Sequence, residues 1–139
     1  MSRPEAVVFD AEPLLAYLAD EPGSSVVERY VEDVQNDRVD AYINTVTLTE
    51  VKYVADRYLS KSEVTEFVES LLEHGVERID ASTCWYESAE IKNEDSVSLG
   101  DAFVLATAQH CEATALVGAD DDFDGITRID IERFRENAA

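Results

Sequence analysis

Hydrophobic positions along the chain fall into two patterns, short uninterrupted runs and longer helical stripes. The apolar run at 6–9 ends abruptly at Asp10, and a second run at 113–118 leads into several acidic residues. Uninterrupted apolar runs are typical of strands buried on both faces of a parallel sheet. Shorter candidate strands lie at 41–44, 76–80 and 128–131. We therefore expect a sheet of four or five short strands.

Between these runs, apolar residues recur at spacings of three and four, which predicts amphipathic helices. Gly75 follows one such stripe and is expected to end its helix. The predicted helices begin near Pro13, Ser25, Thr47, Ser62, Ser82 and Ser98. Strands that alternate with helices predict a parallel, helix-covered α/β sheet, and the length fits a single domain over residues 1–139.

Acidic residues dominate the charged positions. The chain has 31 Asp and Glu against 11 Lys and Arg, a net charge of −20, while 45% of its residues are hydrophobic. The hydrophobic content predicts a folded globule, and the even spread of acids predicts a solvated surface. This balance is typical of a cytoplasmic protein from a halophilic archaeon, where concentrated salt screens self-repulsion. The acidity argues against a basic nucleic-acid footprint, although strong screening weakens that argument.

Several classes of protein are disfavoured by what the chain contains. No segment resembles a signal peptide or an apolar membrane span, so we expect a cytoplasmic location. Cys84 and Cys111 lack metal-ligand spacing, which leaves buried thiols or a disulfide and disfavours zinc. His74 and His110 lie near predicted helix ends, so a serine or cysteine triad lacks a well-placed base. Catalysis, if present, falls to carboxylates.

Two aspartates directly follow the most apolar strands. Asp10 ends the first run, and Asp120 follows the run at 113–118. In open α/β sheets, functional sites form beyond the carboxyl ends of strands, so these two side chains meet if their strands are neighbours. An aspartate at this position can instead cap the next helix, and both interpretations stay open.

Glu50 and Asp101 are two further candidates with the same ambiguity. Thr47 precedes Glu50, and Ser98 precedes Asp101, at the spacing of a capping box. Each acid can therefore be a cap or a ligand. If the four acids share one cleft, their repulsion requires protons or cations. Hard carboxylate oxygens suit Mg²⁺ or Mn²⁺, and two such ions about 4 Å apart can activate water against a phosphodiester.

The acidic run at 120–124 is interrupted by Phe123 and by default predicts a solvated loop. It lacks the residue order of a calcium-binding loop. Arg128, Arg133 and Arg135 follow the run, and solvent-exposed positions are their expected role.

The order of these motifs resembles the PIN domain, the nuclease fold of VapC-type toxins, over nearly the whole chain. The matching segments are Val8-Phe9-Asp10, 47–51, 99–102 and 116–123. The resemblance implies a three-layer α/β/α sandwich with a central parallel sheet of four or five strands. It implies an endoribonuclease dependent on Mg²⁺ or Mn²⁺, with Asp10, Glu50, Asp101 and Asp120 as catalytic, metal-binding acids. By the same resemblance, Asp122 matches an auxiliary metal-binding acid.

The resemblance also implies partners. It suggests an RNA substrate, a cognate VapB-type antitoxin and a homodimer, with no membrane association. The apolar positions Leu15, Leu18, Val27, Tyr30 and Val31 are candidates for an interface or for ordinary core.

Two residues depart from the family pattern. Glu12 stands where many members have a small hydroxyl residue, and Gly118 stands where a Thr or Ser often precedes the fourth acid. Glu12 could join the acidic cluster, whereas Gly118 removes a hydroxyl.

Three other protein classes share some of these features. A phosphatase of the haloacid dehalogenase type requires Asp at the position of Glu12, and it shares with receiver domains a late lysine that this chain lacks after Lys92. The alternative retained is a catalytically inactive PIN-like module that binds RNA or protein.

Overall fold

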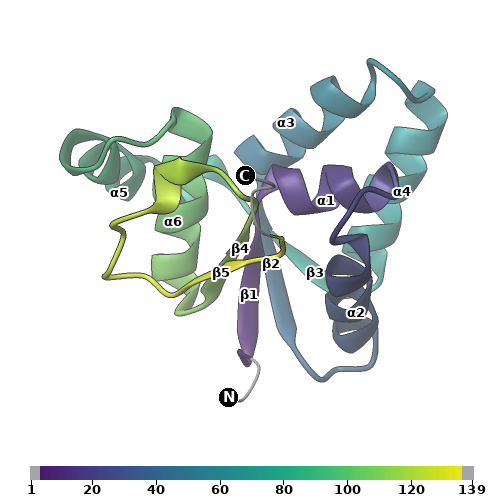
Figure 1. Ribbon diagram of the computed structural model, residues 1–139, viewed down its shortest axis with the longest axis horizontal. Helices are drawn as coiled ribbons and strands as arrows, with labels where there is room; N and C mark the ends of the chain where they lie inside the picture. Colours follow the sequence, from purple (N-terminus) through teal and green to yellow (C-terminus); the bar gives the residue numbers. More distant parts are fainter. Residues whose placement is uncertain (1–3, 136–139) are drawn as a thin grey trace.

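A five-stranded parallel sheet forms the centre of the protein, as seen in the computed structural model, which describes residues 4–135 (Figure 1). The strand order is β3-β2-β1-β4-β5, so the first strand lies in the middle. The strands are β1 (Ala6–Phe9), β2 (Asp40–Asn44), β3 (Val76–Ile79), β4 (Thr114–Val117) and β5 (Ile131–Arg133). The predicted parallel sheet is confirmed, although β5 lies later in the chain than the segment 128–131.

Helices cover both faces of the sheet and complete the predicted three layers (Figure 1). Successive strand residues point to opposite faces. Val7 and Phe9 therefore pack into one hydrophobic core, while Val8 packs into the other. The first core lies against α1 (Ala11–Leu18), α2 (Ser24–Gln35), α3 (Thr45–Ala55) and α4 (Lys61–Glu73), and the second against α5 (Ala81–Glu94) and α6 (Leu99–Cys111).

The start of α3 differs from the prediction in a way that affects the candidate site. Asn44 is the N-cap, and its side-chain oxygen accepts a hydrogen bond from the amide of Val46 at 2.9 Å. Thr47 consequently lies inside the helix, fully buried. The predicted capping box of Thr47 with Glu50 is wrong, because the last residue of β2 already serves as the cap. Glu50 is thereby released from a capping role.

Other helix starts are also displaced from the serines that were predicted to begin them. The helix α4 is capped by Ser60, which forms a complete capping box with Glu63. The N-cap of α2 is Gly23, whose φ of 90° is a left-handed conformation, and no side chain caps this helix. In both cases the earlier turn residue begins the helix. At α6 the predicted cap is confirmed, since Ser98 accepts from the amide of Asp101 at 3.1 Å.

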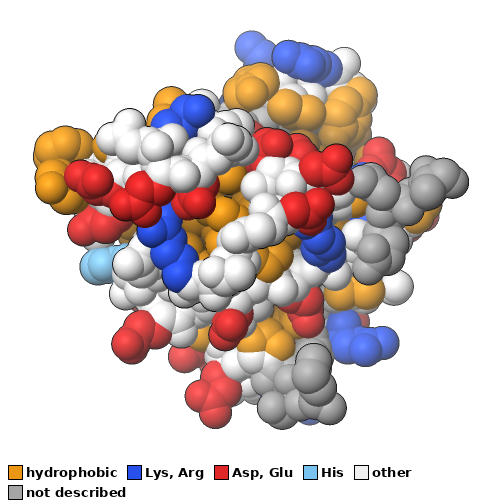
Figure 2. Space-filling model, turned by 60° about the vertical axis from the view of Figure 1, so that its left-hand side comes forward, with side chains coloured by type: hydrophobic (Ala, Val, Ile, Leu, Met, Phe, Trp, Pro, Cys, Tyr) orange, Lys and Arg blue, Asp and Glu red, His pale blue; other side chains and the backbone are white. Residues whose placement is uncertain are grey.

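The apolar interface candidates are mainly core residues. Val27 and Tyr30 are fully buried, and Leu15, Leu18 and Val31 pack against the same core. Cys84 and Cys111 are both free thiols, so the structure contains no disulfide between them. Within 4–135, no helix is long and apolar enough to cross a membrane. Acidic side chains are scattered over the face visible in Figure 2 and do not form one block.

Candidate metal centre

The candidate centre lies where β1 and β4 end side by side. These two strands pair in parallel, with Phe9 opposite Leu116. The pairing continues one residue further, because the amide of Asp10 donates to the carbonyl of Leu116 at 3.0 Å. The loop after β4 carries Asp120, so the neighbouring strand ends that the sequence pattern predicted are observed.

Three acids approach one another closely enough to share one ion. One carboxylate oxygen each from Asp101, Asp120 and Asp122 lies within 4.8 Å of the others. Asp101 comes from the first turn of α6, and the other two come from the loop after β4. The short 3-10 helix at Asp121–Phe123 gives this loop its shape, and its buried Phe123 anchors the loop in the second core. Asp120, Asp121 and Asp124 are exposed, as expected for a solvated loop, but Phe123 anchors the run against the core.

Asp10 and Glu50 lie beside this group without being part of it. Asp10 is 7% exposed and caps α1, where its Oδ1 accepts from the amide of Ala11 at 2.8 Å. Asp10 is therefore a helix cap, and its carboxylate also lies near the other acids. Glu50 projects from the middle of α3 toward Gly100, at whose position any Cβ atom would overlap the Glu50 carboxylate. The glycine before Asp101 therefore makes room for Glu50.

Burial and crowding raise the affinity of these acids for protons. Desolvation is the main reason that the pKa of Asp10 rises from 3.8 to about 8, with repulsion from Asp101, Glu50 and Glu12 adding to it. The pKa of Asp101 rises to about 7, chiefly by desolvation, and Asp122 and Asp120 contribute to this rise. Burial also raises the pKa of Glu50. A divalent cation would supply the positive charge that these groups lack.

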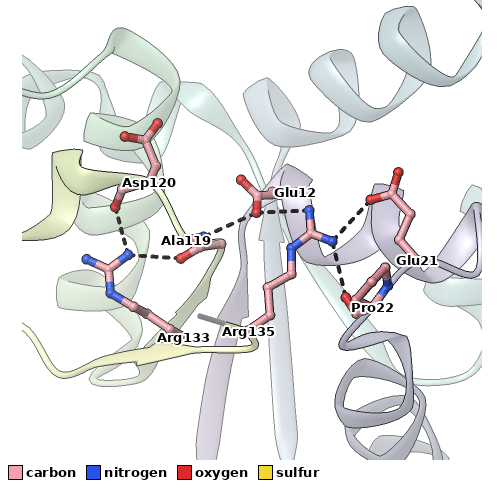
Figure 3. Close-up of polar contacts among 8 residues, drawn as sticks. Glu12, Glu21, Pro22, Ala119, Asp120, Arg133 and Arg135 are labelled. Carbon is pink, nitrogen blue, oxygen red and sulfur yellow. Dashed lines mark hydrogen bonds and ion pairs between the residues drawn. The ribbon is translucent and has the colours of Figure 1, made fainter. Parts of the chain in front are cut away.

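The two departures from the family pattern, Glu12 and Gly118, are neighbours in space, and Figure 3 shows Glu12 beside Ala119. A Cβ atom at Gly118 would overlap the carboxylate of Glu12, so the Glu12 side chain occupies the space that a side chain at 118 would fill. Glu12 accepts a hydrogen bond from the amide of Ala119 at 3.2 Å and pairs with Arg135 at 3.4 Å. Glu12 thus faces the site, as its position in the sequence suggested, but it is already held by a cation.

Two arginines near the candidate centre were predicted to be solvent-exposed, but their side chains are largely buried. The side chains of Arg133 and Arg135 are 22% and 26% exposed. Arg133 binds the loop after β4, and Arg135 binds Glu12, Glu21 and the carbonyl of Pro22 (Figure 3). Arg128, by contrast, pairs with Glu94 and Asp95 on the α5 side. All three arginines bind residues that are not their neighbours in sequence, so the local sequence pattern could not predict these contacts.

Comparisons with known proteins bear on the family and the fold of the chain. A family model described as PIN domain matches residues 7–129. The chain is similar to a structure of VapBC2 from Rickettsia felis bound to a promoter DNA fragment, with 16% identity, a TM-score of 0.70, and coverage of 92% of this chain and 98% of that one. It is also similar to a toxin-antitoxin complex from Klebsiella pneumoniae, with 21% identity, a TM-score of 0.70, and coverage of 94% and 99%.

A third similar structure is DNA-bound VapBC from Salmonella typhimurium, with 19% identity, a TM-score of 0.67, and coverage of 94% of this chain and 98% of that one. No curated protein matches the sequence. At these identities the likeness of the solved structures shows a shared fold.

Proposed function

This chain belongs to the PIN domain family, and we propose that it is a metal-dependent endoribonuclease that acts as the toxin of a toxin-antitoxin pair. The observation that carries the proposal is the group of Asp101, Asp120 and Asp122, with Asp10 and Glu50 beside it. Five acids from four separate segments converge on one edge of the sheet. Asp10 is buried and three of the others are half-buried, and crowded carboxylates withdrawn from water are costly without a counter-charge, so their convergence favours a cation-binding role.

The donor set fits Mg²⁺ or Mn²⁺. Both ions prefer oxygen ligands, and this centre offers carboxylates without histidine or cysteine among the described residues that form it. Asp101, Asp120 and Asp122 would hold the ion, with Asp10 and Glu50 as further candidates for ligands. When bound, such an ion lowers the pKa of a coordinated water and stabilises charge on a phosphodiester.

The protein groups have separate tasks around that ion. Asp10 is fixed at the end of β1 by its hydrogen bond to the amide of Ala11, so its second oxygen has a defined direction. Asp120 is fixed in the same way, because its Oδ1 accepts from the amide of Asp122 at 3.0 Å. Asp10 and Glu50 lie beside these three acids, where a carboxylate within reach of a coordinated water can accept its proton.

RNA is the proposed substrate, and a VapB-type antitoxin and a second copy of the chain are the proposed partners. The antitoxin is supported by the toxin-antitoxin complexes that share this fold. Association is supported by large apolar side chains left at the surface, of which Trp85 is 62% and Leu99 is 60% exposed. Light scattering of the isolated chain measures whether it is a dimer.

Cleavage assays on purified protein test the proposal directly. Labelled transfer RNA and an unstructured RNA are incubated with the wild type and with Mg²⁺, Mn²⁺ or EDTA in concentrated KCl. We expect metal-dependent cleavage, and Asp101→Asn or Asp120→Asn should lower its rate about a hundredfold or more. The matched control is Asp121→Asn, which removes an exposed acid from the same loop and should leave the rate within about twofold.

An inactive binding module gives a different result. In that case the wild type cleaves neither RNA with either metal, its expression does not inhibit growth, and it still binds RNA or a protein partner. Cleavage that persists undiminished in Asp101→Asn would show that the activity comes from a contaminant or from another site.

A further inference from the structure

The loop that carries Asp120 and Asp122 is held by one arginine from the neighbouring strand. Arg133 lies at the end of β5, where the sheet register places it opposite Val117, the last residue of β4. Its Nη1 donates to the carbonyl oxygens of Gly118 at 3.0 Å and Asp120 at 2.7 Å. Its Nη2 donates to Oδ1 of Asp124 at 2.6 Å. One guanidinium group thus connects the first, middle and last parts of the loop.

The contacts leave the candidate ligands available. Arg133 reaches Asp120 at its backbone carbonyl, whereas the carboxylate of Asp120 points away from the arginine in Figure 3. That carboxylate faces Asp101 and Asp122. The arginine therefore fixes the backbone of the loop without neutralising its ligand oxygens, as the outer partners of a metal site commonly do.

The peptide unit between Gly118 and Ala119 is bound from both sides (Figure 3). Its carbonyl accepts from Arg133, and its amide donates to Glu12. Glu12 is in turn paired with Arg135, which also binds the turn before α2. The orientation of this peptide determines where the next residue, Asp120, begins.

We propose that Arg133 is a positioning residue that holds the 118–124 loop in its metal-binding shape before any metal arrives. The inference rests on the proposed function, since it concerns the same centre. A planar guanidinium has five donors in a fixed geometry and stays charged at all relevant pH values, so it can satisfy three acceptors at once. A lysine at 133 would keep the charge but could not reproduce this fork.

The test uses the full chain and three variants, Arg133→Gln, Arg133→Lys and Arg128→Gln. Arg128 is a matched control because it also donates through both Nη atoms, in its case to the carboxylates of Glu94 and Asp95, away from the loop. Circular dichroism first establishes that all three fold. Amide hydrogen exchange of residues 119–124 is then measured without metal, and Mn²⁺ affinity is measured by electron paramagnetic resonance.

In both Arg133 variants we expect loop exchange at least about tenfold faster and a Mn²⁺ Kd higher by about 10–100-fold. Arg128→Gln should stay within about twofold of the wild type in both measurements. Unchanged loop exchange in Arg133→Gln would overturn the proposal. So would full recovery in Arg133→Lys, because charge alone would then suffice.

Failure of the positioning role is distinguishable from failure of the proposed nuclease. If the wild type binds Mn²⁺ and cleaves RNA while the Arg133 variants behave identically, only the positioning role is wrong. If the wild type neither binds Mn²⁺ nor cleaves RNA, the nuclease is wrong, and the metal-free exchange data still decide whether Arg133 orders the loop.

Discussion

Replacing Asp10 by Asn should stabilise the metal-free protein while it abolishes activity. Asp10 is 7% exposed and is surrounded by other acids, so its ionised form is disfavoured in the folded state. Asn keeps a side-chain oxygen that can accept the hydrogen bond from Ala11, and it carries no charge. The substitution therefore removes a destabilising ionisation and retains the helix cap.

The magnitude follows from the difference in pKa between the folded and unfolded states. The folded value is about 8 and the unfolded value is 3.8, so the folded protein binds more protons between these pH values. Stability is therefore highest below the unfolded value and decreases as pH rises toward the folded value. From pH 5 to pH 8 the loss is about 3 kcal/mol, which corresponds to ~6–12 °C in Tm for a domain of this size.

Urea unfolding at pH 5 and pH 8, in EDTA and constant KCl, measures this effect. Wild type and Asp10→Asn should be similar at pH 5, and the variant should be more stable at pH 8 by about 3 kcal/mol. A smaller slope remains in the variant, because the pKa of Asp101 is also raised, to about 7. Equal stability of the wild type at both pH values, or a less stable variant at pH 8, would refute the electrostatic reasoning and leave Asp10 as a cap only.

Three further predictions concern neighbouring residues and the surface. Gly118→Thr alone should lower the free energy of unfolding by about 1–3 kcal/mol in urea, because the new side chain displaces Glu12. Adding Glu12→Ser should recover most of that loss. If the effects of the two substitutions on the free energy of unfolding simply add, the overlap is contradicted. Glu50→Gln should lower the cleavage rate about a hundredfold, whereas the exposed Glu69→Gln on α4 should not, and equal rates would remove Glu50 from the centre. Tm should rise between about 0.1 M and 2 M KCl, as salt screens the charge of −20, and a flat series would contradict salt adaptation.

The sheet and the strand-end acids could be predicted because their signals are local. An apolar run that stops at Asp10 indicates both the buried strand and its end, and the family order of the acids relates that end to Asp120. The helix α3 was predicted to begin at Thr47, whereas its N-cap is Asn44, three residues earlier. The Asn44 side chain caps α3 and also donates a hydrogen bond to the hydroxyl of Thr107 on α6. A tertiary contact thus decided between two equally acceptable local choices.

The arginine contacts and the pairing of Glu12 with Gly118 could not be read from the sequence. Residues 12 and 118 lie at the two ends of the chain and become neighbours only because β1 and β4 are adjacent. A missing side chain and an added carboxylate looked like two separate departures. The two are coupled, because the Glu12 side chain on α1 fills the space that a side chain at position 118 would occupy.

Two kinds of negative charge coexist in this protein, and they respond to different agents. Most acids are solvent-exposed, so dissolved salt screens them. Asp10 is buried and Asp101 is half-buried, and desolvation is the largest cause of their raised pKa values, which bulk ions do not relieve. Salt should therefore stabilise the fold as a whole but leave the pH dependence that Asp10 causes, whereas a bound divalent cation should remove that dependence.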